Sequence, residues 1–150
     1  MEVQQGSLVL LNLLSRSVIC SGDKWYEEGE ALRQVALEGG VYPNGPLVLM
    51  IQDVKNEPAF KKYTLLLPLS SPVEISEDSL QFQESLHLPH TLWKRHYEES
   101  IPLEQSYQEI NDFAEQQRLT IAEPFYHVCL EINGDIYFDI HALITGGAEQ

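Results

Sequence analysis

A single Asn133-Gly134 pair constrains the C-terminal part of the chain more than any other feature. It stands between two runs rich in β-branched and aromatic residues, which together span 124–144. Asn-Gly readily supplies the two positive φ values of a type I′ turn, so this stretch predicts a tight β-hairpin. Counting outward from a two-residue loop places Val128 opposite Asp139.

This register divides the hairpin side chains between two faces, because successive side chains of a strand alternate. One is predicted to be a core face with a polar tip, made of Phe125, His127, Cys129, Glu131, Ile136, Phe138, Ile140 and Ala142. The other mixes aliphatic and aromatic side chains with one carboxylate, and contains Tyr126, Val128, Leu130, Tyr137, Asp139, His141 and Leu143. That mixture is unusual for a solvent face and typical of the floor of a ligand site.

The composition limits the classes of partner. The 150 residues are 43% hydrophobic, which suits one domain with a sizeable core. Nine Lys and Arg against 23 Asp and Glu give a formal charge of −14, which repels phosphate backbones and anionic lipids. We therefore expect no direct nucleic-acid partner and no membrane partner, and a cationic ligand or a basic protein is favoured. The same charge also serves simply to keep a protein soluble.

The N-terminus lacks the positive start and the small-residue cleavage site of a signal peptide, and the apolar run 8–14 is too short to span a bilayer. We therefore expect a cytoplasmic protein. Cys20 and Cys129 lack the spacing of metal ligands, and His127 and His141 fall on opposite faces of the hairpin. These patterns predict no zinc site, no disulfide framework and no cofactor.

Hydrophobic periodicity predicts the order strand, helix, strand, strand, followed by the same order again. The expected elements are strands at 7–21, 47–54, 63–69 and 86–97, helices at 25–38 and 103–117, and the two hairpin strands. The polar stretch 70–78 is the expected linker between a first module, about 7–70, and a second, about 80–144. The tail 145–150 is expected to fray.

The two modules also match each other in sequence. Aligned, they pair Met50 with Val128 and, after one longer loop, Thr64 with Asp139. Such an internal repeat predicts that each module buries one sheet face. We expect the modules to pair about a pseudo-twofold axis into one antiparallel sheet carrying two helices, an α+β fold with a central groove for a ligand.

The chain resembles the GyrI-like small-molecule-binding domains over about 7–144. The residues that carry the resemblance are GDKWYEEGEAL at 22–32 and GVYPNGPL at 40–47 in the first module, and Tyr97, Ser106, Tyr107, Phe113, Pro124-Phe125-Tyr126 and 139–144 in the second. The resemblance implies a single domain that binds a small molecule. Members of that family are ligand-sensing halves of multidrug-responsive transcription regulators, stand-alone proteins that bind drugs or inhibit gyrase, and in some cases hydrolases of electrophilic toxins.

In that family a buried Glu, four positions before a Pro in the last strand, attracts cationic aromatic ligands. The corresponding residues here are Asp139 and Leu143, so the acid is one methylene shorter and the Pro is absent. The Gly that usually precedes Pro124 is replaced by Glu123. The resemblance thus implies Asp139 as the counter-ion of a cationic ligand.

Two further expectations concern the partner. Because Ser7 already begins the first predicted strand, no helix-turn-helix segment precedes the domain, and we expect a stand-alone member. The chain also resembles small uncharacterised proteins of Gram-positive bacteria found beside genes for type VII secretion toxins, and that resemblance implies a protein partner.

The candidate ligand residues centre on Asp139, because a carboxylate in mid-strand is disfavoured unless it has a role or a partner. A solvated or salt-bridged Asp139 is the alternative. Tyr126 and Tyr137 share its face and can stack on a flat or cationic ligand, or simply pack in the core. The same two alternatives hold for the aromatic residues expected at the module edges, which are Trp25, Tyr26, Trp93 and Tyr97.

Three functions follow from these candidates. The first is a non-enzymatic binding protein that holds a small aromatic or cationic ligand, with Asp139 as counter-ion. The second is a protein-interaction module, favoured if long apolar side chains at Val48, Met50 and Leu66 fill the equivalent face of the first module. The third is a hydrolase of electrophilic small molecules, which needs Asp139 and Tyr137 to converge on one water.

Overall fold

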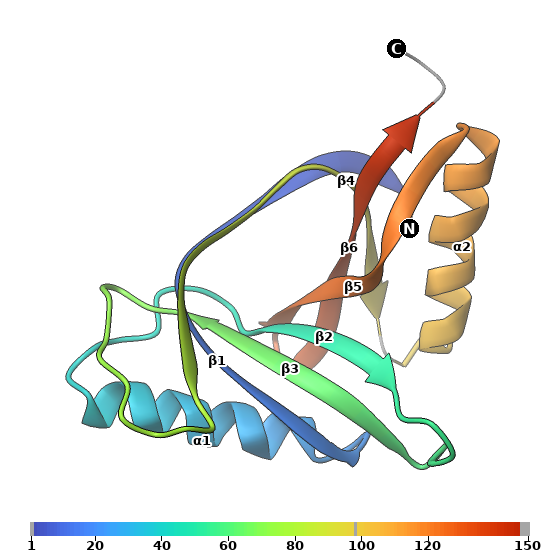
Figure 1. The fold of residues 1–150 in the computed structure, drawn as a ribbon. Helices are drawn as coiled ribbons and strands as arrows, with labels where there is room; N and C mark the ends of the chain where they lie inside the picture. Colours follow the sequence, from blue (N-terminus) through green and yellow to red (C-terminus); the bar gives the residue numbers. More distant parts are fainter. Residues whose placement is uncertain (1, 98, 148–150) are drawn as a thin grey trace. The chain divides into compact units, whose positions relative to one another are not determined.

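The computed structural model describes residues 2–97 and 99–147 (Figure 1). The elements are β1 (Gln4–Ser21), α1 (Trp25–Glu38), β2 (Val48–Asp53), β3 (Phe60–Pro68), β4 (Gln81–Tyr97), α2 (Leu103–Gln116), β5 (Leu119–Ile132) and β6 (Asp135–Gly147). These helices and antiparallel strands confirm the predicted α+β class and the order strand, helix, strand, strand, occurring twice. Among the described residues, neither helix is both long enough and apolar enough to cross a membrane.

The chain divides into two compact units, which are described separately below: residues 10–86, and residues 1–9 with 87–150. The first unit contains antiparallel strands in the order β1-β3-β2, and the second contains them in the order β4-β6-β5. The single-domain organisation, the residue-by-residue repeat, the pseudo-twofold axis and the central groove stay predictions.

In the first unit, helix α1 covers one face of the strands (Figure 1). Its buried residues are Gly29, Leu32 and Ala36, which lie on one side of the helix because they are three or four positions apart. A Cβ atom added to Gly29 would lie 2.8 Å from Cδ2 of Leu47 and 3.8 Å from Cδ2 of Leu65. The missing side chain therefore lets the helix approach the sheet closely.

In the second unit, α2 packs against β5. Ser106, Ile110 and Ala114 are its buried residues, and the ring of Tyr107 contacts Phe125 edge to face at 5.5 Å. The predicted core face of the hairpin is confirmed, because its buried members are Phe125, His127, Phe138, Ile140 and Ala142. Ile110 and Ile140 are fully buried, so the helix and the sheet share one apolar core.

The hairpin of β5 and β6 has the predicted register. Val128 pairs with Asp139, and the flanking pairs follow the same count from the turn. Asn133 has φ of 54° and Gly134 has φ of 86°, the two positive values that a type I′ turn requires. The turn residues therefore decide which side chains of the hairpin share a face.

The C-terminal end of β6 differs from the prediction. The strand continues to Gly147 where a frayed tail over 145–150 was predicted, and 148–150 lie outside the described residues. The hydroxyl of Thr145 donates a hydrogen bond to the carbonyl oxygen of Thr120 at 3.3 Å, so this end is tied to β5. The small, polar residues at this end did not indicate a strand in the sequence, because strand formation depends on pairing with neighbours more than on composition.

The conformation of the hairpin turn leads to a first prediction. Gly134→Ala is expected to lower the free energy of unfolding by about 1 kcal/mol, because an L side chain is strained at a positive φ. Gly22→Ala is the control, since the nearest atom to its added Cβ would be Oη of Tyr63 at an ordinary 3.6 Å. It should change the unfolding free energy by less than about 0.5 kcal/mol in urea titrations. Equal losses in the two variants would contradict the strain at Gly134.

Candidate functional site

One face of the β4-β6-β5 sheet combines aromatic rings with a charged pair. β4 and β6 are antiparallel, and alternate residues of each strand share a face. Paired residues of neighbouring strands also share a face, so three consecutive cross-strand pairs form one row. The pairs of this row are Trp93 with His141, Arg95 with Asp139, and Tyr97 with Tyr137.

Arg95 and Asp139 form a bidentate ion pair at the centre of the row. Nε of Arg95 donates to Oδ1 of Asp139 at 2.7 Å, and Nη2 donates to Oδ2 at 2.9 Å. The side chain of Asp139 is 15% exposed and that of Arg95 is 33% exposed. The hydrogen bond to Asp139 raises the pKa of Arg95 above its ordinary value. Both carboxylate oxygens are thus engaged, and the role of Asp139 as a ligand counter-ion stays a prediction.

Aromatic pairs lie on both sides of this ion pair. The rings of Tyr97 and Tyr137 stack with centroids 4.9 Å apart and an interplanar angle of 24°. On the other side, Trp93 and His141 stack at 5.8 Å and 15°. Stacked rings present a flat, polarisable surface on which planar or cationic groups can pack. The row therefore has the chemistry of a site for a flat ligand that carries charge.

The imidazole of His141 is held in place within the row. Its Nδ1 lies 2.9 Å from the hydroxyl oxygen of Thr91, and the residue is only 8% exposed. Burial lowers the pKa of His141, and the nearby Asp139 carboxylate opposes this shift in part. The ring is therefore neutral at pH 7 and does not add a second positive charge beside Arg95.

The structure brings five of the seven predicted site residues onto this face. Trp93, Tyr97, Tyr137 and Asp139 belong to the row, and Tyr126 of β5 pairs with His141 of β6. Burial raises the pKa of Tyr126, so its phenol stays protonated at neutral pH.

Trp25 and Tyr26 lie in the other unit. Their rings meet edge to face with centroids 5.7 Å apart, and Trp25 is half-buried while Tyr26 is 45% exposed. Their predicted part in the ligand site stays a prediction.

A second polar group, which the sequence analysis missed, lies on the opposite face beneath α2. Lys94 is 2% exposed, and its Nζ donates to the hydroxyl of Ser106 at 3.2 Å and lies 3.4 Å from Oε1 of Glu109. Nδ1 of His96, which is 1% exposed, lies 2.7 Å from the same hydroxyl. Ser106 therefore links the helix to two buried basic side chains of β4 and gives each of them a hydrogen-bond partner.

His127 also lies on this side of the sheet. Its Nε2 lies 2.6 Å from the hydroxyl of Tyr107, and its ring meets Phe138 edge to face at 5.7 Å. Because His127 pairs with Ile140 while His141 pairs with Tyr126, the two histidines face opposite sides, as the hairpin register predicted.

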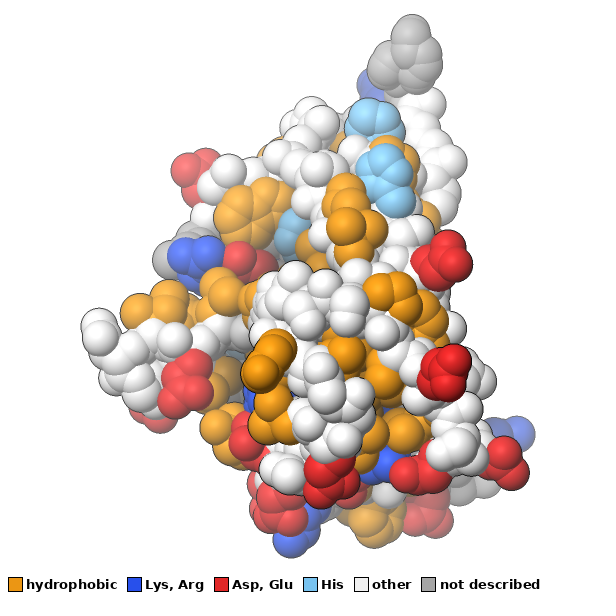
Figure 2. Space-filling view, turned by 90° about the vertical axis from the view of Figure 1, so that its left-hand side faces the viewer, with side chains coloured by type: hydrophobic (Ala, Val, Ile, Leu, Met, Phe, Trp, Pro, Cys, Tyr) orange, Lys and Arg blue, Asp and Glu red, His pale blue; other side chains and the backbone are white. Residues whose placement is uncertain are grey.

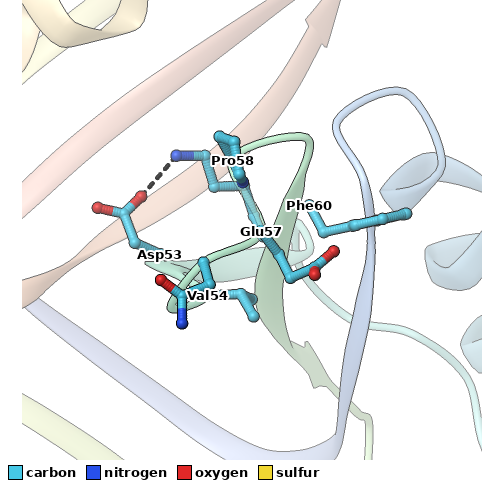
Figure 3. Close-up of a pocket in the computed structure, with 7 residues that line it drawn as sticks. Asp53, Val54, Glu57, Pro58 and Phe60 are labelled. Atoms are coloured by element: carbon cyan, nitrogen blue, oxygen red, sulfur yellow. Dashed lines mark hydrogen bonds and ion pairs between the residues drawn. The ribbon is translucent and has the colours of Figure 1, made fainter.

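Two of the hollows formed by the described residues lie in the unit 10–86. One, of about 330 Å³, opens at the β2–β3 hairpin, where the side chains of Asp53 and Phe60 point in opposite directions (Figure 3). Oδ1 of Asp53 lies 2.5 Å from Nζ of Lys61 at this hollow. The other, of about 210 Å³, lies between α1 and the predicted linker, and its lining includes Val35 and Val73. The first hollow also has a ring, Phe60, beside charged side chains, but the side chain of Asp53 is 89% exposed, so water screens its charge far more than that of Asp139 in the row.

The buried, neutral His141 leads to a prediction about pH. Its pKa is lower in the folded state than the ordinary value of about 6.5, so the unfolded chain takes up the proton first as the pH falls. Its stabilising contribution is complete above about pH 6.5 and is lost as the pH falls through the folded-state pKa.

His141→Gln should therefore lose less stability than the wild type between pH 7.5 and pH 5, while the glutamine can still bond Thr91. Urea unfolding at several pH values measures both slopes. Identical slopes would show that His141 titrates normally in the folded protein.

Solved structures with the same fold share little sequence with this chain. The EcmrR C-terminal domain superposes with a TM-score of 0.72 at 9% identity, over 96% of this chain and 98% of that domain. The EcmrR protein in a complex with DNA matches at a TM-score of 0.66 and 9% identity over 95% of this chain, which spans 57% of that protein.

Two further structures are similar. A hydrolase from Listeria innocua has a TM-score of 0.64 at 11% identity, over 96% of this chain and 92% of that one. SAV2435 bound to tetraphenylphosphonium has a TM-score of 0.52 at 16% identity, over 97% and 95% of the two chains. At these identities the likeness shows the fold alone.

In sequence, no curated protein matches the chain significantly. A family model described as Domain of unknown function (DUF5085) matches residues 9–145. This match covers most of the chain, including both helices and the complete row of β4 and β6. The chain therefore belongs to the family DUF5085.

Proposed function

We propose that the chain is a binding protein of the GyrI-like type that takes a small aromatic or cationic molecule on the row of β4 and β6. The observation that carries this proposal is the Arg95–Asp139 ion pair between two aromatic stacks on one sheet face. The similarity in fold to SAV2435, which was solved with tetraphenylphosphonium, supports it.

Binding would draw on two physical effects. The ring faces of Tyr97, Tyr137 and Trp93 offer negative electrostatic potential to a cation or stacking area to a flat ring. The carboxylate of Asp139, which is only 15% exposed, would neutralise a positive charge in surroundings where water screens it weakly. A ligand that combines one ring and one positive charge uses both effects.

We propose binding without turnover. A hydrolase built on Asp139 and Tyr137 would need a carboxylate oxygen free to take a proton from water. Both oxygens of Asp139 instead accept hydrogen bonds from Arg95, which holds the carboxylate in an ion pair. The similarity in fold to a hydrolase from Listeria innocua keeps hydrolysis as an alternative, and electrophilic small molecules are the substrates that the sequence analysis expects for it.

A protein partner is the second candidate function, because β1 exposes apolar side chains. Val9 is 56%, Leu11 is 58% and Ile19 is 62% exposed. Figure 2 shows Asp and Glu side chains spread over one face of the molecule between hydrophobic ones, and the formal charge is −14. These features suit a basic partner protein and disfavour nucleic acid or an anionic membrane as partners. We propose that the protein works in the cytoplasm. On the equivalent face of the first unit, Val48 and Leu66 are buried.

A thermal-shift panel of aromatic cations, tetraphenylphosphonium among them, tests the first proposal on wild type and Asp139→Asn. A compound at one hundred times its dissociation constant should stabilise the wild type by about 2.7 kcal/mol, or about 5 to 10 °C in melting temperature. The shift should be absent in Asp139→Asn. Thr64→Val is the control, because Thr64 of β3 is the residue that the internal repeat aligns with Asp139. This variant should respond like the wild type.

Equal shifts in wild type and Asp139→Asn would place the binding site elsewhere. A panel in which no compound shifts the wild type would contradict the proposed function and leave the protein-partner candidate.

A further inference from the structure

The ion pair determines what kind of cation can use Asp139. Both carboxylate oxygens already accept hydrogen bonds from one guanidinium group, at 2.7 and 2.9 Å. The guanidinium occupies the edge of the carboxylate at which a planar cation can donate to both oxygens side by side. A ligand that makes such a two-point bond to Asp139 must therefore displace Arg95.

Arg95 is the partner that can move. Its side chain is long and 33% exposed, whereas the short side chain of Asp139 is 15% exposed and fixed close to the backbone of β6. A displaced guanidinium can be solvated, but the carboxylate stays on the sheet. Leaving that carboxylate without hydrogen-bond donors carries a desolvation cost.

A successful ligand must therefore replace two N–H donors as well as one charge. Planar amidinium and guanidinium groups present two parallel N–H donors in the geometry that a carboxylate accepts. Quaternary ammonium and phosphonium ions carry the charge but no donor, so they cannot restore the lost bonds. Hydrogen bonds to a charged group are strong, so a cation that donates two of them to Asp139 should bind more tightly than a cation that donates none.

The flanking rings add the second requirement. A group in the place of the guanidinium lies between the Tyr97–Tyr137 stack and the Trp93–His141 stack. Neighbouring pairs on one face of a sheet are separated by roughly 7 Å, so an aromatic ring attached to the ligand cation can reach either stack. Because His141 is neutral at pH 7, that side does not repel the cation.

Resting on the proposed function, we propose that this site selects aromatic amidinium or guanidinium compounds, which displace Arg95 from Asp139, and that Arg95 is the specificity-determining residue. It acts as a tethered internal cation that competes with the ligand. Cations without N–H donors bind more weakly because they cannot restore the hydrogen bonds that Arg95 gives up.

Two probes test this directly, because benzamidine and phenyltrimethylammonium share one ring and one charge and differ in their N–H donors. Calorimetric titration of the wild type should show benzamidine binding at least tenfold more tightly than phenyltrimethylammonium. Arg95→Gln, which removes the internal competitor, should bind benzamidine at least tenfold more tightly than the wild type. Arg95→Lys keeps the positive charge but not the planar two-donor group, so its affinity for benzamidine should lie between those of the wild type and Arg95→Gln.

Two controls complete the design. Asp139→Asn should lose benzamidine binding, and Thr64→Val should bind like the wild type, since Thr64 pairs with Ser17 in the other unit. Circular dichroism and melting temperature verify that each variant is folded. If Arg95→Gln is unstable, Arg95→Lys takes its place in the test, because the lysine keeps a cationic partner for Asp139.

The outcomes separate this inference from the proposed function. Equal affinity of the wild type for the two cations, or no gain in Arg95→Gln, overturns the selection by Arg95 while binding at Asp139 stands. Benzamidine binding that survives in Asp139→Asn removes this site. Absence of binding of both probes in every variant overturns this inference, and a thermal-shift panel that also shows no shift overturns the proposed function with it.

Discussion

The bidentate bond between Arg95 and Asp139 is the interaction on which the rest of the candidate site depends. It places two opposite charges between two aromatic stacks on one sheet face. Either charge alone would be costly to hold there, because each is partly removed from water. Together they are stable, and they also define which ligand chemistry can enter.

That bond in turn depends on the register of two strand pairings. The Asn133-Gly134 turn aligns β5 with β6, and the β4–β6 pairing sets Arg95 opposite Asp139. A slip of one residue would move every side chain of a strand to the other face. Lys94 would then replace Arg95 on the aromatic side, and a lysine cannot form the planar two-point bond to the carboxylate.

The two faces of this sheet handle polar groups in different ways. Beneath α2, the hydroxyl of Ser106 lies within hydrogen-bond distance of Lys94 and His96, so that side is a closed polar network under the helix. On the other side, the ion pair keeps a partly exposed arginine that can exchange its partner. A structural network and a site poised for ligand therefore occupy opposite faces of the same strands.

Local patterns were enough to predict the helices and the hairpin. The turn residues fixed the β5–β6 register, and so the pairing of Val128 with Asp139, because both signals lie within a few residues. Arg95 was missed because it lies 44 residues from Asp139, and only the pairing of β4 with β6 brings them together. The alternation of Trp93, Arg95 and Tyr97 is the signal that could have indicated a partner for the acid.

Other features depended on packing that a sequence pattern does not specify. The burial of Lys94 and His96 follows from how α2 covers β4 and β5, and an alternating strand does not reveal which face a helix covers. The predicted ligand role of Trp25 and Tyr26 is a second example, because these residues belong to the unit 10–86 and the row belongs to the other unit.

The most direct test of ligand exchange at Asp139 is the side-chain NMR signal of Arg95 Nε–H during titration with benzamidine. In the free protein this proton is hydrogen-bonded to Oδ1 and should exchange slowly with water. Saturation with benzamidine should move the signal and speed its exchange, because the guanidinium is released. If benzamidine saturates the protein while the Arg95 signal keeps its position and its exchange rate, the ligand does not take the place of Arg95.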